Sequence, residues 1–591
     1  TYLWLPDVFG YSWALPQILK KSGIKTFATT KISWNQYNRM PHDAFKWRGI
    51  DGSEIITYFI ATPYPGRKGW GADYNAHITA ETVQGVWEAF KDKALTKDLL
   101  ISYGYGDGGG GVTREMLEMR RRLDKMPGMP RVVTDKAGDY FEGLHRDLAS
   151  TDRYVHTWDG ELYLEYHRGT YTSQAYNKKT NRKLELLYRK TELLGVLASL
   201  FAKDWTTYPA GLLDEGWIIL LRNQFHDILP GSSIREVYED SREEYQKAEQ
   251  LALESKGAAE ACLIEKAEKP AVTIVNDAPW RRTALVKIPV QPETEQGRWL
   301  GPDGSPLKAV KTGNEWLVRI DGAPETGLLP LAFEAGAADS TASESPFRLT
   351  ENGIETPFYD IAWNESGQLV RLYDREARRH ILQENAARGN VLQVFEDKPL
   401  RFDAWDIDLF YQEKMKEVSE LQSVEVVERN ALRVVVRFKW QYDQSEIDQK
   451  MIVYAHSRRI DFETTVDWHE RHQLLKVAFP VDIRATEATY DIQFGNVKRP
   501  THWNTSWDYA RFETVGHQWA DLSETGYGVS LLNDGKYGYD IKDATLRLSL
   551  LKGATYPDHS ADQGRHAFTY ALLPHLGDWI AGGTVQEAWD L

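Results

Sequence analysis

A single aspartate set among glycines is the feature of this sequence most suggestive of chemistry. The stretch ISYGYGDGGGGVTR (101–114) places Asp107 directly before four consecutive glycines, and an apolar run at 99–102 predicts a strand before it. Such a loop could hold a phosphate, form a structural turn, or leave a carboxylate open to a substrate. A phosphate loop needs a lysine, whereas the next basic residue is Arg114 and Asp107 would repel an anion. We therefore favour a functional carboxylate, with a structural turn as the alternative.

A second carboxylate lies near the start of the chain. Asp7 in WLPDVFGYS follows a strand-like run and precedes a predicted helix, whose dipole would favour the ionised side chain. The alternative is a simple helix-capping role. A glycosidase requires two carboxyl groups, one ionised as nucleophile and one protonated as acid. Spacing alone leaves the pairing of Asp7 with Asp107 a hypothesis.

Two further stretches carry polar side chains of chemical interest. His226 and Asp227 in NQFHDILPG (223–231) end a predicted helix. This pair is compatible with a zinc site built from nitrogen and oxygen ligands, although a histidine at a helix end often only complements the dipole. The stretch GELYLEYHRGTYTSQ (160–174) is rich in hydroxyl, aromatic and basic side chains. It suits recognition of sugar hydroxyls, or a buried hydrogen-bond network.

The elements expected around these residues change in type along the chain. Residues 1–140 alternate strand and helix patterns, which predicts a parallel sheet or barrel with function at the strand ends. Asp7, Lys31 and Asp107 each follow a predicted strand. The predicted strands cover 1–5, 25–30, 54–61 and 98–106, and the predicted helices cover 14–23, 80–92 and 112–125.

Later segments predict helices and then strands. Leucines and aromatics at helical spacing cover 174–203, 208–228 and 232–267, which indicates three antiparallel helices. From residue 271 onward, short strands alternate with turns, and the Ala/Ser/Glu-rich stretch 336–345 is the best candidate linker. We predict a multidomain α/β, all-α and all-β chain. Its expected domains are an α/β-barrel part (1–145), a three-helix bundle (146–268), a small β domain (269–340) and a β-sandwich incomplete at its end (341–591).

Composition limits the classes of partner and location. A net charge of −15 argues against a nucleic-acid partner. The sequence contains no run of about 18 apolar residues, so we expect no membrane span. The single cysteine, Cys262, excludes an intramolecular disulfide framework and fits a cytoplasmic protein. The first residues show neither an initiator Met nor a signal-peptide pattern, so we expect an internal part of a longer protein. A homo-oligomer is compatible with the sequence, which does not fix the oligomeric state.

Read together, these stretches resemble the glycoside hydrolase family 38 α-mannosidases, in their bacterial form. The resemblance covers essentially the whole chain in the family's order and implies part of a seven-stranded α/β barrel, a three-helix bundle and β domains. The matching stretches are WLPDVFGYSWALPQILKKSGI (4–24), KISWN (31–35), YGYGDGGGGVTREM (103–116), ELYLEYHRGTYTSQ (161–174), NQFHDILPGSSI (223–234), FEDKPLRFDAWDID (395–408), WNTSWDYARFE (503–513) and LLNDGKYGYD (531–540).

The resemblance also implies an activity and roles for particular residues. It implies hydrolysis of terminal α-linked mannose from oligosaccharides with retention of configuration. Asp7 matches the nucleophile, which also touches a zinc ion, Asp107 matches the general acid/base, and His226 matches a zinc ligand. Residues matched to substrate binding, with the last two added here, are Phe9, Lys31, Asp227, His167 and Arg168.

One departure from the family concerns the metal. The family's other two zinc ligands form a His-x-Asp pair upstream of the nucleophile motif, and this sequence starts after that point. With two of four ligands, we expect residues 1–591 by themselves to bind zinc weakly and to be a poor catalyst. Zinc is the implied metal, and an oxygen-rich site also suits cobalt or another divalent ion.

Two other functions remain open at this point. One is a family member acting on phosphorylated mannosyl-glycerate, which requires a basic pocket that this acidic chain does not reveal. The other is a non-catalytic carbohydrate-binding protein, although such a protein has no use for an acid and nucleophile pair.

Overall fold

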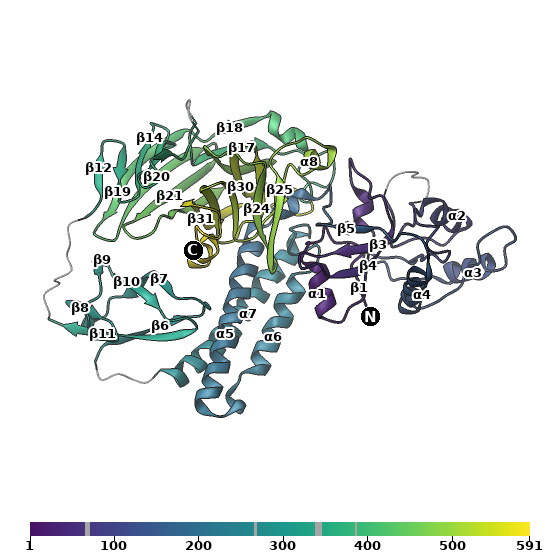
Figure 1. Ribbon diagram of the computed structural model, residues 1–591, viewed down its shortest axis with the longest axis horizontal. Coiled ribbons are helices and arrows are strands. Elements are labelled where there is room, and N and C mark those ends of the chain that lie inside the picture. The colour runs from purple at the N-terminus through teal and green to yellow at the C-terminus, as the bar shows by residue number, and fades with distance from the viewer. Residues whose placement is uncertain (65–70, 265–268, 337–344, 384–386) are drawn as a thin grey trace. The chain divides into compact units, whose positions relative to one another are not determined.

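The chain folds into two compact units. The computed structural model describes residues 1–64, 71–264, 269–336, 345–383 and 387–591 (Figure 1). The first unit comprises residues 1–168 and 489–512, and the second comprises 169–488 and 513–591. The predicted linker lies, except for its two end residues, outside the described part, and the predicted domain boundaries stay predictions. None of the described helices is both long and apolar enough to cross a lipid bilayer.

The first unit is built on a mixed sheet with the strand order β1-β2-β4-β3-β5. Three pairs are parallel, and β3 pairs antiparallel with β4, which differs from the parallel sheet that the sequence predicted. The short turn at residues 49–53 explains the difference, because a parallel connection needs about a dozen residues or more. The strands are β1 (Tyr2–Trp4), β2 (Thr26–Thr29), β3 (Ala44–Arg48), β4 (Glu54–Phe59) and β5 (Thr157–Asp159).

Both faces of this sheet are buried. In β2, Phe27 points to one apolar cluster and Ala28 to another, as the two-residue period of a strand requires. Leu19 from the first helix packs on the first face, and Phe141 from the fourth helix packs on the second. Burial on both faces explains why the strands read as nearly continuous apolar runs.

Helices and loops complete the first unit. The helices are α1 (Leu15–Lys21), η1 (Lys31–Trp34), α2 (Ala80–Ala89), α3 (Arg114–Leu123), α4 (Ala137–Ser150) and α8 (Ser506–Ala510), and the unit also contains β25 (Gly495–Pro500). Side chains of Thr79 and Thr113 accept hydrogen bonds at the starts of α2 and α3, which are ordinary N-caps. The prediction missed α4.

The predicted strand over 98–106 does not form. This segment instead makes two isolated bridges, Ala76 with Tyr103 and Tyr105 with Gly111. Glycines at 104 and 106 weaken regular strand structure, which explains the difference.

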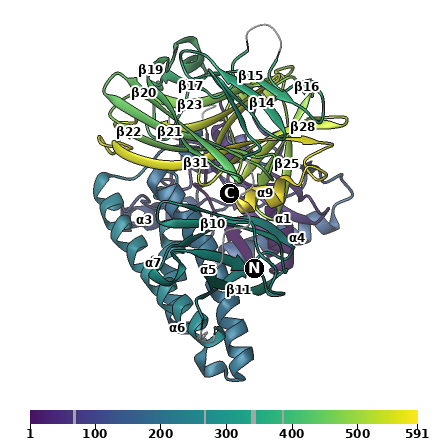
Figure 2. The same cartoon turned by 90° about the vertical axis from the view of Figure 1, so that its left-hand side faces the viewer.

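Three long helices open the second unit, as the sequence predicted. They are α5 (Ala175–Ala202), α6 (Ala210–Asn223) and α7 (Arg235–Leu263), which run side by side in both views (Figures 1 and 2). Leu184 of α5, Leu220 of α6 and Tyr245 of α7 share one buried cluster. The Tyr188 hydroxyl donates to the carbonyl of Ala248 at 2.7 Å and ties α5 to α7.

A small β region follows, made of two three-stranded sheets. Their orders are β7-β10-β9 and β6-β11-β8, and Trp316 of β10 packs on Phe333 of β11 between them. The elements of this region are β6 (Ala271–Asn276), β7 (Arg282–Pro289), η4 (Pro292–Thr294), β8 (Gly297–Leu300), β9 (Ala309–Thr312), β10 (Glu315–Ala323) and β11 (Gly327–Ala335). The short helix η3 (Trp205–Thr207) lies earlier in the chain, between α5 and α6.

The remaining strands form larger antiparallel sheets. Strands β12 to β16 form a five-stranded meander. One large sheet has the strand order β18-β17-β23-β30-β29-β26, and the second large sheet has, within this unit, the order β19-β20-β21-β22-β31-β28-β27. Phe462 of β22 packs on Phe479 of β23, so these two large sheets face each other as the predicted sandwich.

The bounds of these elements are β12 (Arg348–Thr350), β13 (Gly353–Glu355), β14 (Tyr359–Trp363), β15 (Leu369–Asp374), β16 (Arg379–His380), β17 (Val391–Glu396), η5 (Leu409–Glu413), β18 (Met415–Glu417), β19 (Glu420–Arg429), β20 (Arg433–Tyr442), β21 (Ser445–Tyr454), β22 (Ile460–Trp468), β23 (Gln473–Pro480), β26 (Thr514–Val515), β27 (Trp519–Glu524), β28 (Tyr527–Asn533), β29 (Gly538–Lys542), β30 (Thr545–Lys552), β31 (Gly564–Leu576) and α9 (Thr584–Asp590). Most of β24 (Glu487–Ile492) belongs to the first unit.

Candidate active site

Asp7 and Lys31 come together because they follow the same end of two neighbouring parallel strands. Asp7 follows β1 and Lys31 follows β2, and the register pairs Tyr2 with Thr26. The carbonyl of Pro6 accepts hydrogen bonds from the Thr30 hydroxyl at 2.7 Å and from the Lys31 amide at 3.1 Å. These bonds fix the two loops against each other at the strand ends.

Lys31 forms an ion pair with Asp7. The ammonium contacts Oδ1 of Asp7, and Lys31 is 4% exposed, so the pair is largely shielded from water. The ammonium also lies 3.6 Å from the ring centre of Trp34 and 5.8 Å from that of Phe9. A nearby positive charge stabilises the ionised carboxylate that a nucleophile needs.

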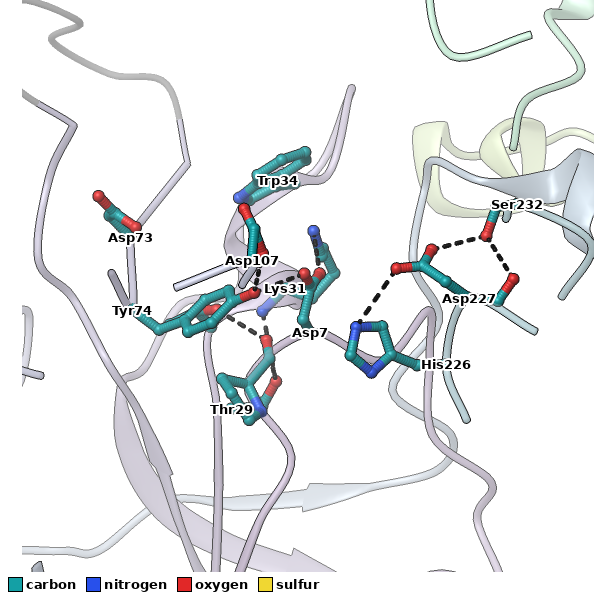
Figure 3. Close-up of polar contacts among 12 residues, drawn as sticks. Asp7, Thr29, Lys31, Trp34, Asp73, Tyr74, Asp107, His226, Asp227 and Ser232 are labelled. Carbon is teal, nitrogen blue, oxygen red and sulfur yellow. Dashed lines mark hydrogen bonds and ion pairs between the residues drawn. The ribbon is translucent and has the colours of Figure 1, made fainter. Parts of the chain in front are cut away.

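A tyrosine hydroxyl connects Asp7 to Asp107 (Figure 3). The Tyr74 hydroxyl donates to Oδ2 of Asp7 at 2.8 Å, and the oxygen of this hydroxyl lies 3.3 Å from Oδ1 of Asp107. Burial, together with the charge and hydrogen bond of Asp7, raises the pKa of Tyr74 well above its usual range. Tyr74 therefore stays a hydrogen-bond donor between two carboxyl groups.

The glycine loop holds Asp107 open to solvent. Tyr105 and Gly111 exchange two backbone hydrogen bonds of 2.8 Å, which close the loop, and Asp107 at its tip is exposed with a positive φ of 50°. A Cβ added to Gly106 would lie 2.2 Å from Oδ1 of Asn75. The missing side chain thus allows the loop to approach the segment that carries Tyr74.

Phe9 and His167 form an aromatic wall in the first unit. Their rings are 4.8 Å apart in an edge-to-face arrangement, and the ring of His167 lies 6.1 Å from that of Trp34. The Lys31 ammonium is beside both Phe9 and Trp34. The structure therefore gathers Phe9, Lys31 and His167, three residues that the sequence assigned to substrate binding.

Arg168 occupies a different environment. Its guanidinium is completely buried and donates to the carbonyl of Ala510 at 2.9 Å and to Oε1 of Gln36 at 3.1 Å. It also stacks 4.3 Å from the ring centre of Phe512. These contacts tie residues 510–512 into the first unit, and the substrate contact predicted for Arg168 stays a prediction.

His226 and Asp227 belong to the second unit, in the loop after α6. Nε2 of His226 lies 3.6 Å from Oδ2 of Asp227, and Oδ1 of Asp227 accepts from the Ser232 hydroxyl at 2.7 Å (Figure 3). The hydroxyl of Ser233 donates to the backbone carbonyl of Asp227 at 3.0 Å. Both side chains are partly exposed.

Sequence reasoning missed Tyr74 and Asp73. Asp73 is 8% exposed, and burial raises its pKa above the usual value, with the Asp107 charge acting in the same direction. Both residues lie in GADYNAH, which has no periodicity that would mark it as functional. Trp34 was within a recognised stretch, KISWN, but its contact with Lys31 was not foreseen.

Family models match this chain in three consecutive parts. "Glycosyl hydrolases family 38 N-terminal domain" matches residues 1–161, "Alpha mannosidase middle domain" matches 165–261, and "Glycosyl hydrolases family 38 C-terminal domain" matches 354–560. The chain belongs to glycoside hydrolase family 38. The resemblance seen in the sequence is thereby confirmed.

Individual family 38 relatives agree with this assignment. Alpha-mannosidase 2C1 of Homo sapiens is 37% identical over 592 residues, which cover 100% of this chain and 54% of that protein. Alpha-mannosidase G of Dictyostelium discoideum is 33% identical, over 100% of this chain and 56% of its own length. The chain thus spans about half the length of the curated relatives it matches.

A solved structure supports the fold. The crystal structure of an alpha-mannosidase from Enterococcus faecalis V583 superimposes with a TM-score of 0.82 at 16% sequence identity. The match covers 99% of this chain and 75% of that one. At this identity the likeness concerns the fold, a multidomain mixture of α/β and sheet-rich parts.

Proposed function

We propose that this chain carries the catalytic carboxyl groups of a retaining α-mannosidase that removes terminal α-linked mannose from oligosaccharides. The observation that carries the proposal is the shared hydroxyl of Tyr74, which both Asp7 and Asp107 reach. The names of the family 38 relatives point to the same activity.

The spacing of the two carboxyl groups supports retention. Both reach one hydroxyl oxygen, so the two nearest carboxylate oxygens lie no more than about 6 Å apart, whereas inverting enzymes separate these groups by about 6.5–9.5 Å. Retaining enzymes place them about 5–5.5 Å apart. The upper limit of about 6 Å between the nearest oxygens is compatible with direct attack by a carboxylate.

The two carboxyl groups take different roles because their surroundings differ. Asp7, held ionised by Lys31, attacks the anomeric carbon while Asp107 gives its proton to the leaving oxygen, so that the glycosidic C–O bond breaks and a mannosyl ester forms. Asp107, now a base, takes a proton from water. The water oxygen bonds to the anomeric carbon and the ester bond to Asp7 breaks.

We also propose that Asp7 and His226 contribute to a divalent-metal site, with zinc as the first candidate. A carboxylate oxygen and an imidazole nitrogen are donors that zinc accepts. They fall short of a complete site, because no group of three or more His, Cys, Asp or Glu side chains able to hold a metal occurs in the described part of the chain. The steps above therefore use this chain's residues alone.

The metal proposal has its own test. Zinc binding is measured by calorimetry for the intact parent enzyme and its Asp7→Asn and His226→Ala variants, with exposed His380→Gln as control. Loss of at least tenfold in affinity in both variants is expected. Unchanged affinity in either one removes that residue from the ligand set.

Finer features of the fold and location are part of the proposal. We propose that the sheet of the first unit belongs to an α/β barrel and that α5, α6 and α7 form a bundle domain. The single cysteine, Cys262, is free and supports a cytosolic location. Substrate-binding roles for Phe9, Lys31, His167, Arg168 and Asp227 are proposed with the same activity.

One experiment decides between hydrolysis and simple carbohydrate binding. The intact parent enzyme is given p-nitrophenyl α-mannoside, and proton NMR follows which anomer of mannose appears first. Release of α-mannose first is expected, with the β-mannoside as the control substrate. β-Mannose appearing first contradicts retention, and binding without hydrolysis contradicts the enzyme itself.

A further inference from the structure

The loop that carries His226 and Asp227 is held by a buried lysine from a neighbouring helix. Lys178, in the first turn of α5, donates to the backbone carbonyls of Leu229 at 2.9 Å and Pro230 at 3.2 Å. It also donates to the carbonyl of Ser173. Three N–H bonds of an ammonium are matched by three carbonyls.

Burying a lysine ammonium without a carboxylate partner costs free energy, and this cost indicates a specific structural role for Lys178. Lys178 is 5% exposed, and burial lowers its pKa to about 7, although the charge of Asp562 acts in the opposite direction. Its three acceptors are uncharged carbonyls rather than a carboxylate. Buried ammonium groups are tolerated when every donor has a partner, as here.

A second contact joins the same two segments. Gly231 has a φ of +95°, and a Cβ added to it would lie 2.5 Å from the carbonyl oxygen of Ser173. Residue 231 thus rests directly on the residue whose carbonyl Lys178 also holds. The end of the loop is clamped against the start of α5 by both contacts.

The other contacts of the loop fix Asp227 from a different side. The Tyr238 hydroxyl donates to the carbonyl of Asp227 at 3.2 Å, and Ser232 and Ser233 bond to the same residue. These bonds come from residues that follow the loop, whereas Ser173 directly precedes α5 and Lys178 lies in its first turn. The residues 226–231 are therefore anchored at both ends.

We infer that Lys178 is a positioning residue that holds the loop bearing His226 and Asp227 in the orientation these side chains need to act. The inference rests on the proposed function, because it assumes that His226 and Asp227 meet a metal or a sugar. It adds a residue for which neither the sequence motifs nor the family resemblance supplied a role.

The chain provides a matched control. Lys179 follows Lys178 on α5 but forms a partly exposed ion pair with Asp534 at 2.9 Å. Lys178→Met removes the donors from the three carbonyls, whereas Lys179→Met removes the same type of side chain one position along the helix, with its contacts to Asp534 and the carbonyl of Ala567. Any difference between these variants therefore reports the clamp rather than charge or helix propensity.

The test measures loop mobility and activity separately. Amide hydrogen exchange at pH 6, read by mass spectrometry on the intact parent enzyme, is expected to rise at least tenfold in residues 225–231 of Lys178→Met. The remaining peptides of α5 and α7 should be unchanged, and Lys179→Met should match wild type. On an α-mannoside, Lys178→Met should lose at least tenfold in kcat/KM, and Lys179→Met less than twofold.

Gly231→Ala provides an independent route if Lys178→Met does not fold, because it pushes the loop from Ser173 and leaves the lysine in place. The same local rise in exchange is expected. Unchanged exchange in the loop, or a rise spread over all three helices, overturns the positioning role. If exchange in the loop rises in the variants but the wild-type protein does not hydrolyse α-mannosides, the positioning role of Lys178 stands and the proposed function is contradicted. The two failures are therefore distinguishable.

Discussion

The hydroxyl of Tyr74 lies 2.8 Å from Oδ2 of Asp7, and it donates its single proton there. The longer distance of 3.3 Å to Asp107 leaves that carboxyl group less strongly bound to the same hydroxyl. Asp7 additionally has the Lys31 ammonium, whereas Asp107 is exposed at the tip of a glycine loop. Two carboxyl groups in unlike surroundings can divide the roles of nucleophile and acid between them.

Replacing Asp107 should affect substrates according to their leaving groups. Asp107→Asn removes the proton donor, so kcat/KM for a mannobiose is expected to fall by about 10²- to 10⁴-fold. A 2,4-dinitrophenyl mannoside needs no protonation, so its first step should change little. Asp7→Asn should abolish both, and exposed Asp152→Asn serves as control. Equal losses on both substrates for Asp107→Asn would contradict its role as acid.

Tyr74→Phe tests the bridging hydroxyl. A hydrogen bond to a charged group contributes about 1.5–3 kcal/mol, so kcat/KM is expected to fall by about 10- to 100-fold. Because the pKa of Tyr74 is raised by burial and by the Asp7 carboxylate, the hydroxyl remains protonated, and the loss should be the same from pH 5 to pH 9. Exposed Tyr154→Phe is the control. A loss confined to one side of neutral pH would show that Tyr74 itself titrates.

Lys31→Met tests whether the cation keeps Asp7 ionised. Without it the Asp7 carboxylate loses its adjacent positive charge, so kcat/KM should fall by about 10- to 100-fold. Lys31→Arg retains the charge and should recover part of the activity. Lys46→Met on β3, which breaks a partly exposed pair with Glu54 of β4, is the control. Equal losses in Lys31→Arg and Lys31→Met would indicate that Lys31 acts by packing against Trp34 rather than by its charge.

The sequence could place Asp7 and Lys31 because both follow apolar runs whose period is that of a strand. Neighbouring parallel strands end at the same edge of a sheet, and this rule needs no knowledge of distant contacts. Asp107 was identified from its glycines, although the strand expected before it does not form. The three long helices were recognisable from their leucine spacing, whereas β3, β5 and α4 were not.

Tyr74 could not be predicted from the sequence. Its role arises from a meeting of three loops, and the stretch GADYNAH has neither a strand nor a helix period. Lys178 was equally hidden, because a lysine in KKTNRK on a helix normally faces solvent. Only the packing of α5 on the loop after α6 turns it inward.

A buried charge network in the sandwich should dominate the stability of that part. Lys476 of β23 is fully buried, contacts Glu513 and donates to the Tyr411 hydroxyl at 2.9 Å. Lys476→Met leaves the Glu513 charge buried without this partner and should cost about 3–5 kcal/mol of the free energy of unfolding. The double variant Lys476→Met/Glu513→Gln should recover much of the loss.

The control for this network is an exposed pair nearby. Lys414 lies 2.8 Å from Glu396, with both side chains at least one-third exposed. Lys414→Met should change stability by less than about 1 kcal/mol in urea unfolding. If Lys476→Met costs no more than Lys414→Met, the buried network is not a determinant of stability.

His456, between β21 and β22, should make stability depend on pH. Burial, with the nearby Arg319 charge acting in the same direction, lowers the pKa of His456 to about 4 in the folded protein. The unfolded chain takes up this proton near its ordinary value of about 6.5, so stability is lost as pH falls from there through about 4, by about 1–3 kcal/mol. The wild type therefore loses this stability between pH 7 and pH 4, whereas His456→Gln does not. If the variant has the lower calorimetric midpoint at pH 7, the difference between the two midpoints should be smallest at pH 4. Exposed His380→Gln provides the comparison, and parallel pH curves for wild type and His456→Gln would contradict the neutral, buried state assigned to His456.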